Sequence, residues 1–178
     1  MNNSARYTIW QGKSWRLCSA ARVLADGTLV KTTYIDHPGA VVLVPWLDDS
    51  PEPTVLMLRQ YRHALADFIL ELPAGTRGEN EDWNACAQRE LREETGQEAE
   101  QLIELGRCWP APGVSNEIMA IYLACGLHTN PLPQDDDEEI EVVPYPFNDL
   151  VRMALDGSLL DAKSIVGILR TARYKRLL

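Results

Sequence analysis

The segment 82–95 most constrains how this chain can fold, because it has the pattern of a helix yet gathers three glutamates near its end. Residues three and four apart are helical neighbours, so Glu90, Glu93 and Glu94 fall on one face. Inward-facing carboxylates repel one another, and the helix macrodipole disfavours each near a C-terminus by about 0.3–1 kcal/mol. A bound divalent cation would offset both costs, whereas a solvated acidic helix end that stops at Gly96 is the alternative. The rest of the glutamate face is apolar: Trp83, Cys86 and Ala87.

The residues around this helix follow a defined spacing. Gly75 is followed after five residues by Glu81, and after seven more by Arg-Glu-Leu-Arg-Glu-Glu-Thr-Gly over 89–96. This string resembles the signature of the Nudix hydrolases at every position but the last, which is usually aliphatic and here is Gln97. The departure affects the packing of the turn more than the chemistry. The resemblance implies an α/β/α sandwich with a mixed sheet, in which the signature forms a loop, a helix and a loop.

The resemblance also assigns roles to the signature residues. It implies that Glu90 and Glu94 coordinate a metal, that Glu93 contributes to a further ion, and that the carbonyl of Ala74 is another ligand. Carboxylate and carbonyl oxygens suit Mg²⁺, for which Mn²⁺ can substitute. A metal on phosphate oxygens would neutralise charge and orient a water for attack on phosphorus. Arg89 would hold a glutamate in place; its alternative role is a surface ion pair worth under about 1 kcal/mol.

A water nucleophile also benefits from a base, and carboxylates bound to metal are poor bases. The acidic run 135–141 resembles the loop that supplies this base in the ADP-ribose pyrophosphatase branch of the family. By that pattern Glu138 is the base, with Glu139 and Glu141 as competitors. The alternative is a solvated charge run.

Other stretches resemble the branch that cleaves nucleoside diphosphate sugars. They are 58–62 (Leu-Arg-Gln-Tyr-Arg), 70–75 (Leu-Glu-Leu-Pro-Ala-Gly) and Pro112-Gly113, which follows the signature at the distance typical of the ADP-ribose group. The implied function is Mg²⁺-dependent hydrolysis of ADP-ribose or a related sugar nucleotide to a nucleoside monophosphate and a sugar phosphate. The alternatives are a Nudix hydrolase of a dinucleotide cofactor, a nucleoside triphosphate or a diadenosine polyphosphate, and a catalytically silent nucleotide-sugar-binding regulator.

The same resemblance implies the substrate contacts. Arg62 would meet the diphosphate in two-point fashion, with Arg59 as the alternative. Glu71 would bond the base or ribose, or else form a salt bridge at a strand end, and Glu117 would contact the terminal sugar. Four aromatic residues can stack on a nucleobase or fill the core, and none is assigned: Trp10, Trp15, Tyr61 and Trp109.

The composition indicates one domain over 1–178, since 46% of the 178 residues are apolar. By family analogy, residues 1–38 would form N-terminal antiparallel strands that join a homodimer, and 39–178 the catalytic core. A net charge of −9 argues against nucleic acid or an anionic membrane as partner. We expect a cytoplasmic protein, because the N-terminus lacks the apolar run of a signal peptide. The widely spaced cysteines predict reduced thiols and no zinc site: Cys18, Cys86, Cys108 and Cys125.

Hydrophobic patterning predicts the remaining elements. An Asp-Gly pair at 26–27 between two strand-like runs indicates a hairpin. Strands on both sides of one central helix, with helices at the end, indicate a mixed sheet covered by helices. The expected strands are 16–24, 28–36, 40–45, 54–59, 68–72, 102–108, 118–125 and 140–145. The expected helices, besides 82–95, are 148–155 and 161–174.

Overall fold

The computed structural model describes residues 6–47, 52–134 and 139–178. The described strands are β1 (Arg6–Gln11), β2 (Arg16–Val23), β3 (Leu29–Asp36), β4 (Ala40–Leu47), β5 (Thr54–Arg62), β6 (Asp67–Glu71), β7 (Ala74–Thr76), β8 (Gln97–Cys108), β9 (Met119–Thr129) and β10 (Ile140–Pro146). The described helices are α1 (Trp83–Thr95), α2 (Phe147–Asp156) and α3 (Ala162–Tyr174).

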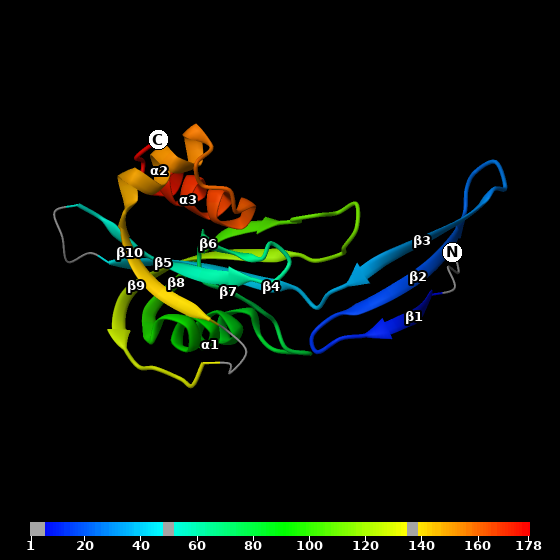
Figure 1. Ribbon diagram of the computed structural model, residues 1–178, viewed down its shortest axis with the longest axis horizontal. Helices are drawn as coiled ribbons and strands as arrows, with labels where there is room; N and C mark the ends of the chain where they lie inside the picture. The colour runs from blue at the N-terminus through cyan, green and yellow to red at the C-terminus, as the bar shows by residue number, and fades with distance from the viewer. Residues whose placement is uncertain (1–5, 48–51, 135–138) are drawn as a thin grey trace.

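A mixed sheet forms the centre of the molecule (Figure 1). Its described strands run in the order β10-β5-β4-β9-β8, with β6 paired to β5 and β7 paired to β4. Strands β4 and β9 are parallel, and the other pairs are antiparallel. Helix α1 covers one face of the sheet, and α2 and α3 cover the other. The expected α/β sandwich with a mixed sheet is therefore confirmed.

The two cores follow from the alternation of side chains along each strand. On β4, Val42 and Val44 pack in the cluster that contains α2 and α3, whereas Val41 and Leu43 pack with Leu91 of α1. All five side chains are fully buried. The continuous apolar run of the sequence is thus explained by a strand covered on both faces.

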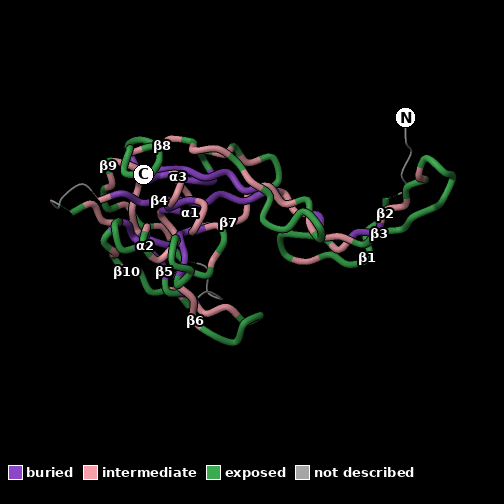
Figure 2. Tube along the Cα trace, turned by 90° about the horizontal axis from the view of Figure 1, so that it is seen from above, coloured by how far each residue is buried: buried purple, intermediate pink, exposed green. Residues whose placement is uncertain are grey.

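Strands β1, β2 and β3 form a separate antiparallel sheet, the N-terminal arm (residues 6–36), which projects from the core (Figure 2). The predicted hairpin around the Asp-Gly pair lies here, with Gly27 at a φ of 85°. Much of the arm is exposed, including large apolar side chains that a free monomer seldom leaves in water. These side chains are Tyr7, Ile9, Trp10, Val23 and Leu29.

Every expected strand and helix is present, but some boundaries differ. Strand β8 begins at Gln97 and not at residue 102, because Gly96 ends α1 in the left-handed conformation and the chain enters the strand at once. Strand β9 continues to Thr129. Two short strands, β1 and β7, were not individually expected, since β7 has three residues and no readable periodicity. No described helix has both the length and the apolar character needed to cross a bilayer.

Candidate active site

A cavity of about 700 Å³ opens where β5, β7, α1 and the start of α3 meet. The tip of the hairpin between β1 and β2 also reaches it. Its polar and charged wall brings together residues far apart in the sequence. Among them are Lys13, Arg62, Arg89, Glu90, Glu117 and Lys163.

Helix α1 carries the acidic side of this cavity. The side chain of Asp82 caps its first turn by accepting the N–H groups of Asn84 at 2.9 Å and Ala85 at 3.2 Å. Glu90 and Glu94 are only 8% and 6% exposed, so the predicted inward direction of these carboxylates is confirmed. Glu93 is half-buried and, like Glu90, lines the cavity.

Gly75 on β7 lies directly against the carboxylate of Glu90. A Cβ atom at this position would be 1.8 Å from Cδ of Glu90 and 2.1 Å from each of its oxygens. No side chain can occupy that space while the carboxylate stays where it is. The glycine that opens the signature is therefore required by the close approach of the helix carboxylate to the strand.

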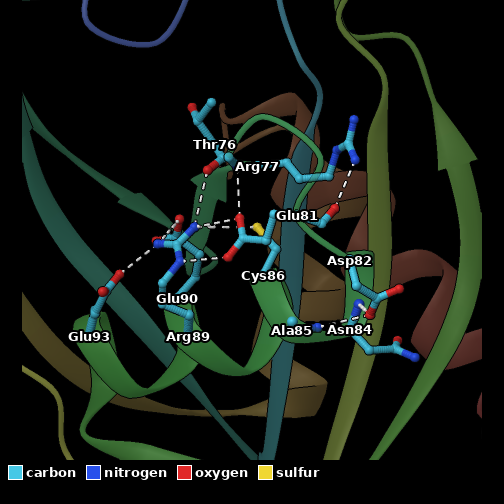
Figure 3. A network of polar contacts seen from close by, with 11 residues as sticks. Thr76, Arg77, Glu81, Asp82, Asn84, Ala85, Cys86, Arg89, Glu90 and Glu93 are labelled. Carbon is cyan, nitrogen blue, oxygen red and sulfur yellow. Dashed lines mark hydrogen bonds and ion pairs between the residues drawn. The ribbon is translucent and has the colours of Figure 1, made fainter.

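Arg89 binds three carboxylates at once (Figure 3). Its Nε and Nη2 donate to Glu81 at 2.9 and 3.1 Å, and its Nη1 lies 2.7 Å from Glu90 and 2.8 Å from Glu93. Nη2 also donates to the carbonyl of Thr76 at 3.2 Å. This geometry places Arg89 at the centre of the acidic cluster and links β7 to α1.

The pKa of Glu81 lies at about 2, below its ordinary 4.5. The hydrogen bonds that Glu81 accepts from Arg89 and from the backbone N–H of Gly78, together with the charge of Arg89, outweigh the effect of burial. A lowered folded-state pKa adds stability above pH 4.5 that is lost as the pH falls toward 2. We expect Glu81→Gln to cost about 1–3 kcal/mol in the free energy of unfolding at pH 7. This difference from the wild type should shrink steadily below pH 4.5.

Urea unfolding of both proteins at several pH values measures this effect. Glu79→Gln, a change at an exposed glutamate of the same loop, is the control and should shift the free energy of unfolding by under about 0.5 kcal/mol. A pH-independent difference for Glu81→Gln would contradict the assignment.

Glu94 lies behind the cavity wall, where its Oε2 accepts the backbone N–H of Ala74 at 2.8 Å. Among the described residues, no three acidic, histidine or cysteine side chains converge as a complete set of metal ligands. The donors nevertheless fit a hard cation, because Mg²⁺ takes only one or two carboxylates from a protein and fills its octahedron with water and phosphate oxygens. Glu90 and Glu93 offer such carboxylates at the cavity, beside the backbone of Ala74.

Glu71 joins two cations that line the cavity, Arg62 and Lys163. Arg62 donates from Nε and Nη2 to its two oxygens at 2.8 and 2.9 Å, and Lys163 of α3 is paired with it too. Glu71 is 1% exposed, so the structure places it in the salt bridge that the sequence left open as an alternative. Lys163 also donates to Asp161 at 3.0 Å.

Lys163 was not predicted as a site residue. A lysine in the first turn of a helix is disfavoured by the macrodipole, and this was the signal available in the sequence. Lys13 and Ser14 of the arm were missed too, because nothing in the hairpin sequence indicates that its tip reaches the cavity.

The candidate bases lie at or beyond the edge of the described structure. Glu138 lies outside the described residues. The backbone carbonyl of Glu139 accepts the N–H of Tyr61 at 3.2 Å, and Tyr61 lines the cavity. The acidic run therefore enters β10 beside the cavity wall. Glu141 is exposed and pairs with Arg59 at 3.5 Å.

Glu117 belongs to the loop between β8 and β9 and lines the cavity. Its Oε1 lies 3.9 Å from Nδ1 of His37, and its backbone N–H donates to Oγ of Ser115 at 3.0 Å. Of the four aromatic residues left unassigned, Tyr61 lines the cavity. The rings of Trp10 and Trp15 contact each other in the arm, and Trp109 is exposed and precedes Pro110, which lines the cavity.

A profile of the NUDIX domain matches residues 36–165, which contain helix α1 and the strands of the mixed sheet from β4 to β10. The chain belongs to the Nudix family.

Curated relatives align over most of their length. The chain is 31% identical to the ADP-ribose pyrophosphatase of Bacillus subtilis (strain 168), over 92% of this chain and 88% of that protein. It is also 31% identical to the methanol dehydrogenase activator of Bacillus methanolicus, over 82% of this chain and 78% of that protein. Identity is 31% with the GDP-mannose pyrophosphatase of Yersinia enterocolitica serotype O:8 / biotype 1B (strain NCTC 13174 / 8081), over 77% and 74%.

A solved structure has the same fold. It is the crystal structure of an ADP compounds hydrolase, with a TM-score of 0.82 over 98% of this chain and 94% of that chain. The sequence identity of this pair is 20%, so the likeness concerns the fold.

Proposed function

We propose that this Nudix hydrolase splits ADP-ribose or a related nucleoside diphosphate sugar, with Mg²⁺, into a nucleoside monophosphate and a sugar phosphate. One observation carries the proposal: the same cavity is lined by the α1 carboxylates Glu90 and Glu93 and by the cations Arg62 and Lys163. A diphosphate needs both, because its charge is neutralised by a cation on one side and by protein cations on the other. Relatives named ADP-ribose pyrophosphatase and GDP-mannose pyrophosphatase support this substrate class.

In this proposal Glu90, Glu94 and the carbonyl of Ala74 hold one Mg²⁺, Glu93 contributes to a further ion, and Mn²⁺ substitutes for Mg²⁺. When bound, the metal supplies charge neutralisation on the phosphate oxygens and a more acidic water. Arg89 keeps the carboxylates of Glu90 and Glu93 in place through the contacts described above.

The remaining roles belong to the chain itself. Arg62 and Lys163 bind the diphosphate. Glu71 holds both cations in position, because its carboxylate accepts hydrogen bonds from Arg62 and is paired with Lys163. Glu138 takes the proton from the attacking water, with Glu139 and Glu141 as competitors. Glu117, which lines the same cavity from the loop between β8 and β9, contacts the terminal sugar.

We further propose a homodimer that acts in the cytoplasm. The exposed apolar side chains of the arm support an interface, because pairing two arms would bury them. The four cysteines are free thiols, which fits a reducing compartment. In this division residues 1–38 serve dimerisation and 39–178 catalysis, within one domain.

The proposal is tested by incubating the purified protein with a panel of ADP-ribose, GDP-mannose, NAD and diadenosine tetraphosphate in Mg²⁺, and separating the products by chromatography. We expect AMP and ribose phosphate from ADP-ribose or the corresponding pair from another sugar nucleotide, and no product with EDTA in excess. Preferred cleavage of NAD or the diadenosine compound would replace the substrate class. No product from any compound would contradict the proposed hydrolysis.

A further inference from the structure

Asp36, at the end of β3, connects all three strands of the arm to the core. It is 7% exposed. Its Oδ2 accepts Nε of Arg16 on β2 at 3.1 Å and is paired with Arg6 on β1. Its Oδ1 accepts Nδ2 of Asn116, which belongs to the loop between β8 and β9, at 2.8 Å. One buried carboxylate therefore has partners on β1, β2 and a loop of the core.

Asn116 completes the connection from the other side. Its Oδ1 accepts the backbone N–H of His37 at 2.8 Å, so its amide bridges the last residue of β3, Asp36, and the residue that follows. The backbones meet here as well: Ile35 donates to the carbonyl of Val114 at 2.8 Å and accepts the N–H of Asn116 at 3.2 Å. We call these contacts of Ile35, Asp36, His37 and Asn116 the arm joint.

On each side of the arm joint, in the core and in the arm, one residue lines the cavity. Glu117 follows Asn116 directly and lines the cavity from the core. Lys13, at the hairpin tip between β1 and β2, lines the same cavity from the arm. Because β1, β2 and β3 form one hydrogen-bonded sheet, the angle of the arm at the joint determines where Lys13 lies relative to Glu117.

The joint is held firmly at neutral pH. Burial alone would raise the pKa of Asp36, but the hydrogen bond from Asn116 and the charges of Arg6 and Arg16 outweigh it and lower the pKa. The carboxylate is thus charged and fully partnered. Removing the Asn116 amide would leave Oδ1 of the buried Asp36 carboxylate without this donor, which is more costly than losing an exposed hydrogen bond.

We propose that Asp36 and Asn116 are positioning residues that fix the arm against the sugar side of the cavity, so that Lys13 and Glu117 together select the nucleotide sugar. This inference rests on the proposed function and adds a determinant of substrate specificity outside the signature. Neither Asp36 nor Asn116 is among the residues that line the cavity. They act through Lys13 and Glu117, because the arm joint sets the distance between these two residues.

The test compares Asn116→Ala with Asn130→Ala, which removes an amide that bridges Arg92 and Glu98 away from the cavity. For Asn116→Ala we expect KM for ADP-ribose to rise about tenfold while kcat stays within about twofold, since binding and not chemistry is disturbed. The ratio of kcat/KM for ADP-ribose to that for GDP-mannose should change as well. Asn130→Ala should leave KM and this ratio at their wild-type values.

A second variant guards against loss of folding. Lys13→Met alters an exposed hairpin tip and should raise KM in the same direction with an unchanged melting temperature. Unchanged KM in both Lys13→Met and Asn116→Ala, or an equal fall of kcat in Asn116→Ala, would overturn the inference.

Hydrogen exchange separates this inference from the proposed function. In Asn116→Ala we expect faster exchange of the His37 amide and of the arm, with the amides of β4 unchanged. If the wild type hydrolyses none of the panel, the proposed function fails, and the joint is tested by this exchange and by calorimetry with ADP-ribose. Exchange at wild-type rates in Asn116→Ala would overturn the joint whether or not the protein is active.

Discussion

Glu90→Gln should lower kcat for ADP-ribose by about 10²–10³-fold, because it removes one charge from the proposed metal site while keeping the shape of the side chain. Because glutamine has the same shape as glutamate, we expect it to occupy the same space against Gly75. The change also relieves repulsion within the acidic cluster, and Arg89 keeps Glu81 and Glu93 as partners. The melting temperature in Mg²⁺-free buffer should therefore stay equal or rise, a combination typical of a functional charge.

Steady-state kinetics at saturating Mg²⁺ and a thermal melt measure both effects. Glu100→Gln is the matched control, since Glu100 is exposed on β8, and it should change neither kcat nor the melting temperature. Wild-type kcat in Glu90→Gln would remove Glu90 from the proposed metal site.

Gly75→Ala should reduce activity by about 10²-fold or more and also destabilise the fold. The added Cβ would stand 1.8 Å from Cδ of Glu90, so the carboxylate, the strand or the helix must move. Overpacking of this kind costs about 1–3 kcal/mol. In a chain of this size that lowers the melting temperature by about 2–4 °C per kcal/mol.

Gly113→Ala is the control, because a Cβ there meets nothing within 4 Å. It should keep both stability and kcat. Combining Gly75→Ala with Glu90→Asp shortens the opposing side chain and should recover the melting temperature without recovering kcat. If Gly75→Ala alone keeps full activity, the close approach of Gly75 to Glu90 does not matter for the reaction.

Local patterns in the sequence were sufficient for most of the fold. The 3.6-residue period predicted that Glu90 and Glu94 face inward, and Gly96 correctly marked the helix end. The apolar run at 40–45 predicted a buried strand, which became β4. These features depend on residues within one or two turns of each other, where backbone geometry alone determines the outcome.

The parts of the site that escaped prediction depend on distant pairs. Lys163 meets Glu71 across 92 positions of sequence, and Asn116 meets Asp36 across 80. Neither pair has a periodicity or spacing that one sequence can reveal, because the sheet topology brings them together. Glu71 illustrates the limit: its role as a substrate ligand or salt-bridge partner could not be separated until Arg62 and Lys163 were found on its oxygens.

The proposed reaction requires that the inward-facing carboxylates of α1 hold a divalent cation. The most direct measurement is a titration of the wild type and of Glu90→Gln with Mn²⁺, followed by electron paramagnetic resonance of the free ion. We expect the wild type to deplete free Mn²⁺ and Glu90→Gln to bind it at least about tenfold more weakly, a loss of about 1.4 kcal/mol. Equal binding by the two proteins, or no binding by either, would contradict it.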